Sequence, residues 1–87
     1  MTRSYLSPKL PRDVDGEQLA RKLCSRFGYA MRHRVGSHIV LQLSGTSAPH
    51  ITVPAHKSIA VGTLSSIIRA VEVQTGASRD ELLRLLA

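Results

Sequence analysis

Residues 29–43 read YAMRHRVGSHIVLQL, and this run indicates the fold class more clearly than any other part of the chain. Gly36-Ser37 is a two-residue hairpin signal. The strand expected after it, residues 38–43, alternates large aliphatic side chains with polar or smaller ones, at the period of two that strands show. Because isoleucine and leucine must take the core face, His38 is expected on the open face of the sheet.

The strand expected before the turn, residues 29–35, alternates bulky and basic side chains. Its predicted core-facing residues are Tyr29, Met31 and, as a further candidate, His33. The alternation places Arg32 and Arg34 outward, on the same face as His38. The hairpin therefore predicts a basic open face that carries one histidine.

The segments around the hairpin supply a third strand and a first helix. The third strand is expected over residues 50–54, after a loop rich in Ser, Gly and Thr. Before the hairpin, apolar side chains in residues 16–27 recur at the spacing of an amphipathic helix. Asp13 or Asp15 is its expected N-cap, and Gly28 stands just past its end, where a left-handed residue is usual.

Two more helices are expected after the third strand. Gly62-Thr63 opens one of them, with Thr63 as the predicted N-cap, and its apolar stripe continues to Gly76. Ser78 and Glu81 have the spacing of a capping box ahead of four leucines. A short third helix is therefore expected at the C-terminus.

This order of elements predicts an α+β fold, a two-layer sandwich in which a three-stranded antiparallel sheet carries the helices on one face. Residues 1–87 are expected to form one domain, with residues 1–14 as an extended lead-in that contains Pro8 and Pro11. Two interpretations of the last helix stay open. Its leucines either complete the small core or widen an apolar surface for a partner. These leucines are Leu82, Leu83, Leu85 and Leu86.

The composition favours a negatively charged partner. The 87 residues include 12 Lys and Arg against 6 Asp and Glu, for a formal charge of +6. Aromatic residues make up only 3% of the chain, which argues against RNA-binding modules that stack bases on aromatic rings. The apolar runs are too short for a membrane span and the N-terminus does not resemble a secretory signal, so we expect a soluble cytoplasmic protein.

Metal and thiol chemistry have little support in the sequence. The four histidines, His33, His38, His50 and His56, do not have the spacing of a zinc site, and there is one cysteine. Neither a metal nor another cofactor is expected. Cys24 falls on the apolar stripe of the first helix, so it is expected to be a small core residue.

The predicted position of His38 suits RNA cleavage. An imidazole, which titrates near about pH 6.5, can accept the proton of a ribose 2′-hydroxyl or donate one to the leaving 5′-oxygen. Guanidinium groups such as those of Arg32 and Arg34 can offset the charge that builds on phosphorus. The alternative is that His38 only forms a hydrogen bond within its hairpin.

Six basic residues are candidates for one continuous phosphate-binding patch. They are Arg21, Lys22, Arg26, Arg32, Arg34 and Lys57. The alternative is a solvated basic face that binds nothing. The helix that begins near Thr63 offers free backbone N–H groups as a further place for a phosphate, although most helix N-termini bind only their cap and water.

Taken in order, several short strings resemble the HicA family of type II toxins. They are Leu10-Pro11-Arg12 with Gly16 through Leu19, Phe27-Gly28-Tyr29, Gly36-Ser37-His38, Val53-Pro54-Ala55-His56, and Gly62-Thr63-Leu64 through Ile68. The resemblance covers about residues 9–86. It implies an α-β-β-β-α fold like that of double-stranded-RNA-binding domains. The long lead-in and the extra C-terminal helix depart from that minimal fold.

The resemblance also implies an activity and a partner. The family's members are endoribonucleases that cut mRNA without a metal and are held inactive by a HicB antitoxin, with which a heterotetramer or larger complex is expected. The catalytic histidine carries over to His38, and Gly36 and Ser37 carry over as the turn that positions it. His56 matches a recurrent position after the third strand. Charge and strand parity, not the resemblance, add three RNA-binding candidates: Arg32, Arg34 and Lys57.

Two other functions stay open at this point. A non-catalytic module would bind structured RNA through the same face, with an affinity that falls steeply as salt rises, and would leave the RNA intact. A pure interaction protein would use its basic face to dock an acidic protein. Cleavage of RNA would identify the nuclease, and RNA binding without cleavage would identify the binding module. Absence of RNA binding at low salt would identify the interaction protein.

Overall fold

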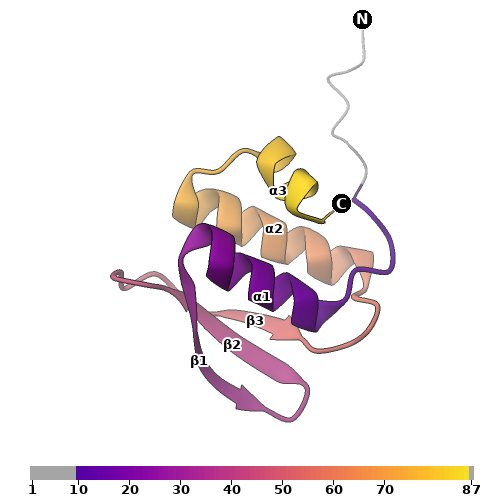
Figure 1. Cartoon of the computed structure of the whole chain (residues 1–87), viewed down its shortest axis with the longest axis horizontal. Coiled ribbons are helices and arrows are strands. Elements are labelled where there is room, and N and C mark those ends of the chain that lie inside the picture. Colours follow the sequence, from indigo (N-terminus) through magenta and orange to yellow (C-terminus); the bar gives the residue numbers. More distant parts are fainter. Residues whose placement is uncertain (1–9, 87) are drawn as a thin grey trace, which may run out of the picture.

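A computed structural model describes residues 10–86, and its elements follow the expected order (Figure 1). They are α1 (Gly16–Phe27), β1 (Tyr29–Val35), β2 (His38–Leu43), β3 (Ile51–Pro54), α2 (Val61–Thr75) and α3 (Arg79–Leu86). The three strands form one antiparallel sheet in the order β1-β2-β3. All three helices lie on one side of this sheet, so the predicted two-layer α+β architecture is confirmed.

The core lies between the sheet and the helices. Its fully buried side chains come from every layer: Leu19 and Leu23 of α1, Leu41 of β2, Val53 of β3, Leu64, Ile68 and Val71 of α2, and Leu82 of α3. Burying one such side chain contributes about 1.5–3 kcal/mol, so this small set is the main source of stability for a domain of this size. The face of the sheet away from the helices has no covering element within residues 10–86.

Helix α1 begins and ends where the sequence predicts. Asp15 is the N-cap, and its carboxylate accepts hydrogen bonds from the backbone N–H groups of Glu17 (2.9 Å) and Gln18 (3.2 Å). Gly28 ends the helix with φ +79°, in the left-handed region that favours glycine. Asp13, the other candidate cap, instead accepts a hydrogen bond from the Ser58 hydroxyl at 3.0 Å.

The prediction that Thr63 caps α2 is wrong. The N-cap is Ala60, three residues earlier, and it offers no side-chain hydrogen bond, so the helix begins at Val61. An apolar cap is tolerated because packing of Leu64 and Ile68 against the core holds the first turns in place. The helix ends before Gly76, where the apolar stripe is expected to end, and Gly76 has φ +77°.

The C-terminal helix α3 contributes to the core. The predicted capping box is present: the Ser78 hydroxyl accepts from the backbone N–H of Glu81 at 3.1 Å, and the Glu81 carboxylate accepts from the backbone N–H of Ser78 at 3.1 Å. Leu82 is fully buried and Leu85 is nearly so. Of the two interpretations left open by the sequence, completion of the core is therefore the one that the structure supports.

The lead-in is partly packed. Leu10 and Val14 lie against the core, and the backbone N–H of Ile59 donates to the Val14 carbonyl at 2.9 Å. Residues 1–9 of the expected lead-in, with Pro8 among them, lie outside the described residues. The third strand begins at Ile51, one residue later than predicted.

Candidate active site on the open face of the sheet

His38 is the first residue of β2 and its side chain is exposed. It lies opposite Val35 of β1 and Pro54 of β3 in the antiparallel ladders. Its neighbour Ile39 is 3% exposed and faces the helices, so alternation puts His38 on the opposite, open face of the sheet. The predicted placement of this imidazole is confirmed.

A tight turn holds His38 at this edge. Gly36 has φ +57°, the conformation that a two-residue hairpin needs at its first central position and that a residue with a Cβ adopts only under strain. The Ser37 carbonyl accepts a hydrogen bond from the Ala55 backbone N–H at 2.6 Å. This hydrogen bond joins the turn to the segment that follows β3. The end of the hairpin is therefore held by β3 as well as by the pairing of β1 with β2.

The pairing of β1 with β2 is interrupted at Arg32. Met31 lies opposite Leu41 and His33 lies opposite Val40, so Arg32 is left as an extra residue in β1. A bulge of this kind reverses the alternation beyond it. His33 therefore lies on the open face with Val40 and His38. The sequence, read with an unbroken alternation, makes His33 a candidate for the core face.

The same irregularity makes the predicted placement of Arg34 wrong. Arg34 lies opposite Ile39 and therefore faces the helices. Its guanidinium donates to the Glu17 carboxylate of α1 at 3.1 Å and to the Gly36 carbonyl at 3.2 Å. The hydrogen bond and charge of Arg34 lower the pKa of the Glu17 carboxylate, and the same contact raises the pKa of Arg34. Arg34 is thus a tether between the hairpin and α1, away from the face of His38.

The remaining candidates lie around the end of β3. His56 has an exposed side chain, and its carbonyl accepts from the backbone N–H of Gly16 at 2.8 Å. Lys57 is exposed and lines a shallow hollow beside the start of α1 together with Arg21. Asp15 and Glu17 line the same hollow, so the two basic side chains are balanced by two acidic ones.

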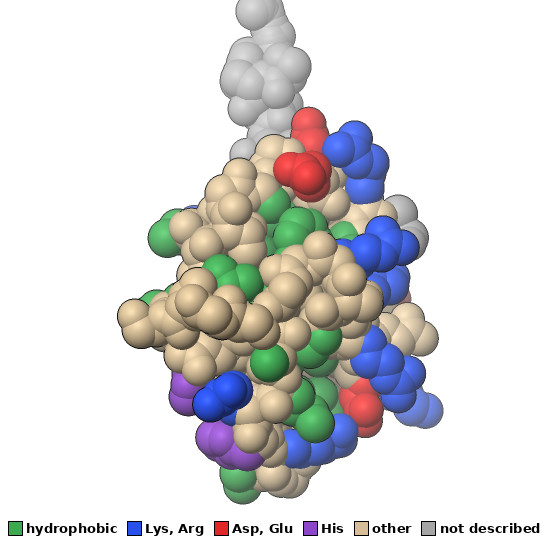
Figure 2. All heavy atoms as spheres, turned by 60° about the vertical axis from the view of Figure 1, so that its left-hand side comes forward, with side chains coloured by type: hydrophobic (Ala, Val, Ile, Leu, Met, Phe, Trp, Pro, Cys, Tyr) green, Lys and Arg blue, Asp and Glu red, His purple; other side chains and the backbone are tan. Residues whose placement is uncertain are grey.

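The basic side chains of α1 do not meet in one hollow. Figure 2 shows Lys and Arg side chains along one flank of the molecule, whereas histidines gather near its lower end, where Figure 1 places the end of the β1–β2 hairpin. The ammonium group of Lys22 donates a hydrogen bond to the Leu85 carbonyl at 2.9 Å. Arg26 lines a separate hollow with Arg84 of α3. The six residues considered for a continuous patch are therefore divided among several sites.

An apolar groove of about 500 Å³ lies between α1 and β1. Met31, 60% exposed, lies along it, with Ile39 and Leu41 at its base. Cys24 also lines the groove, and burial raises the pKa of its thiol. The expectation that Cys24 is a core residue is thus only partly right, because it packs against the core from a half-buried position.

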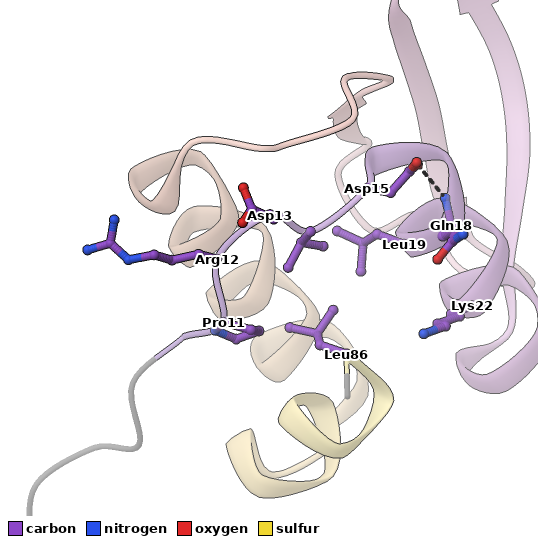
Figure 3. Close-up of a pocket in the computed structure, with 9 residues that line it drawn as sticks. Pro11, Arg12, Asp13, Asp15, Gln18, Leu19, Lys22 and Leu86 are labelled. Carbon is purple, nitrogen blue, oxygen red and sulfur yellow. Dashed lines mark hydrogen bonds between the residues drawn. The ribbon is translucent and has the colours of Figure 1, made fainter.

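A smaller cavity of about 120 Å³ lies between the lead-in, α1 and the end of α3 (Figure 3). Leu19 and Leu86 point into it, while Arg12 extends away from it. Charged and polar side chains, among them Asp13, Asp15 and Lys22, also line it. A space of this size is too small for a nucleotide.

Residues 10–86 were searched for metal-binding clusters and for membrane-spanning helices. No three His, Cys, Asp or Glu side chains of this part of the chain are grouped so that they could hold a metal ion. None of the helices described is long and apolar enough to cross a membrane.

Comparison with known protein families adds an independent finding. The family model described as "HicA toxin of bacterial toxin-antitoxin" matches residues 16–73, which is more than half of the chain. The match runs from the first residue of α1 into the last turns of α2 and includes the whole sheet, whereas the lead-in and α3 lie outside it. No curated protein and no solved structure matches the chain significantly.

Proposed function

Because this chain belongs to the HicA family of toxins of bacterial toxin–antitoxin systems, we propose that it is an endoribonuclease that cleaves mRNA, with His38 as a catalytic residue. The reaction needs no metal ion and takes place in the cytoplasm. A HicB-type antitoxin neutralises the toxin by binding it, in a heterotetramer or a larger complex.

The observation that most supports this proposal is the exposure of His38 on a face that no described element covers. RNA is much larger than the hollows found among residues 10–86, so its cleavage requires a reactive group on an open surface. An imidazole in that position can take part in proton transfer at a ribose-phosphate linkage without a cofactor.

The other site residues have supporting roles in the proposal. Gly36 and Ser37 form the turn that holds His38 in place. Arg32, His56 and Lys57 are exposed and are proposed to bind phosphates. Arg34 is half-exposed and already bonded to Glu17, so any contact of Arg34 with RNA would compete with that ion pair.

The test is cleavage of a defined mRNA by purified protein in the presence of EDTA. The expected result is that wild type cuts the mRNA and that His38→Ala abolishes cleavage. His50→Ala is the matched control, because His50 is also exposed but lies beside α2, with Arg69 and Val73. Thermal melting shows whether both variants keep the fold.

The outcomes separate the proposal from its alternatives. Equal cleavage by wild type and His38→Ala would show that His38 is not catalytic. Salt-sensitive RNA binding without cleavage would identify a non-catalytic RNA-binding module. Absence of RNA binding at low salt would leave protein–protein interaction as the function.

A further inference from the structure

The open face carries a second imidazole near His38. His33 lies opposite Val40, and Val35 lies opposite His38, in a stretch of ladder that is regular. Residues two apart in a strand share a face, and so do directly opposed residues. His33 and His38 are therefore diagonal neighbours on the same face, and both side chains are exposed.

The spacing suits two groups that act on one linkage. Diagonal neighbours in an antiparallel pair are about 7–8 Å apart, a distance that long side chains span. Two imidazoles extending from these positions can therefore approach a single phosphodiester from its two sides. This juxtaposition depends on the bulge at Arg32, because without the extra residue His33 would face the helices.

We propose that His33 and His38 act together as the acid–base pair of the cleavage reaction, an inference that rests on the proposed function. One imidazole, neutral, accepts the proton of the ribose 2′-hydroxyl as the 2′-oxygen forms a bond to phosphorus. The other, protonated, donates its proton to the 5′-oxygen as the bond from phosphorus to that oxygen breaks. The products are a 2′,3′-cyclic phosphate and a 5′-hydroxyl, and no proton is gained or lost overall.

The surroundings of the pair contain few other ionisable groups. The neighbours on the open face, Val35, Val40, Thr52 and Pro54, are not ionisable. Two residues of the adjoining segments carry charge or titrate: Arg32, at the bulge, and His56, two residues past Pro54. Arg34 and Glu17, the ion pair close to the turn, belong to the helix side. Arg32 is thus the nearest fixed positive charge on β1 for a bound phosphate.

The test compares wild type, His33→Gln, His38→Gln and the control His50→Gln in EDTA, as rates of RNA cleavage across about pH 5 to 9. Wild type and His50→Gln are expected to give a bell-shaped profile with two ionisations. His33→Gln is expected to cut about 10²–10⁴-fold more slowly, with one limb of the bell lost. Thermal melting and RNA binding are expected to stay unchanged, because both histidines are exposed and lie outside the core.

A second substrate assigns the two roles. After the cleavage site is mapped, the leaving 5′-oxygen of a short RNA is replaced by sulfur, which departs without a proton. The variant that lacks the acid is expected to cut this RNA at nearly the wild-type rate, and the variant that lacks the base is expected to stay slow.

The results that would overturn the inference are specific. Wild-type activity of His33→Gln, or lower activity with both limbs of the bell retained, would exclude His33 from proton transfer while leaving His38 and the proposed function intact. Failure of the sulfur-containing RNA to restore either variant would exclude the division of roles. No cleavage by wild type would overturn the proposed function, and the inference with it.

Discussion

Gly16, the first residue of α1, lies so close to Pro54 at the end of β3 that a Cβ at Gly16 would overlap the Pro54 carbonyl oxygen. Its backbone N–H also donates to the His56 carbonyl at 2.8 Å. The start of α1 is therefore joined directly to the segment that supports the His38 turn. Only glycine allows this approach, although the backbone angles at Gly16 are those of an ordinary helix.

Gly16→Ala is expected to destabilise the protein by about 1–3 kcal/mol or more, because a backbone carbonyl cannot move aside as a side chain can. Urea unfolding followed by circular dichroism measures the loss. Gly62→Ala is the matched control, since Gly62 is also in the first turn of a helix and a Cβ added there would meet no atom within 4 Å. Equal stability of the two variants would show that the contact with Pro54 is not close.

Leu82→Ala is expected to destabilise the protein by about 2–5 kcal/mol, because this α3 side chain is fully buried and its removal leaves a cavity. The comparison is Leu83→Ala in the same helix, where the side chain is only partly buried and a smaller loss is expected. Chemical unfolding of both variants gives the difference. A loss as small for Leu82 as for Leu83 would mean that α3 is not part of the core.

Glu17→Gln is expected to change stability in a pH-dependent way. Arg34 lowers the pKa of the folded-state carboxylate below its ordinary value of 4.5, so the ion pair stabilises the fold above that value and the benefit disappears as pH falls through the lowered pKa. The difference in melting temperature between wild type and Glu17→Gln should therefore shrink in acid. It should also shrink in high salt, since both side chains are exposed. A difference that is constant from pH 7 to pH 2 would contradict this account.

Tyr29→Phe tests how the Tyr29 hydroxyl contributes to the loss of folding stability at high pH. Burial raises the pKa of the Tyr29 hydroxyl from 10 to about 12. The folded state therefore holds this proton more tightly, and the stability it provides is present below pH 10 and lost as pH rises toward 12. Near neutral pH, Tyr29→Phe should lose about 1 kcal/mol from the hydrogen bond that the hydroxyl donates to Gln74.

The comparison of wild type with Tyr29→Phe removes the effect of the other groups that titrate in alkali. Denaturant midpoints from pH 8 to pH 11.5 are expected to fall more steeply for wild type than for the variant. Parallel curves would show that the phenol is not buried in the folded state.

Most of the fold could be predicted because local signals and burial agree. Asp15 and Gly28 delimit α1, and the alternation in β2 leaves one face apolar enough to identify the core. These signals depend on neighbours in the sequence. The contact of Gly16 with Pro54 does not, since it depends on how α1 packs on β3. The start of α2 at Val61 could not be predicted from the sequence either, because tertiary packing replaces the side-chain cap that Ala60 does not provide.

The candidate site could be predicted only in part. The sequence predicts His38 on the open face because Ile39 and Leu41 beside it have to be buried. The predicted faces of Arg34 and His33 are wrong, because one extra residue in β1 reverses the alternation and nothing in the sequence marks where it falls. The run of three consecutive polar residues, Arg32, His33 and Arg34, departs from a strict period of two, but it does not show which of them is the extra residue.

The bulge at Arg32 also bears on how the molecule behaves in a crowded solution. β1 is an outer strand of the sheet, and an unpaired edge offers its backbone groups to strands of other molecules. Irregular pairing and guanidinium charge at Arg32 disfavour such recruitment. The extra residue that turns His33 outward therefore also makes this edge of the sheet a poorer template for strand pairing.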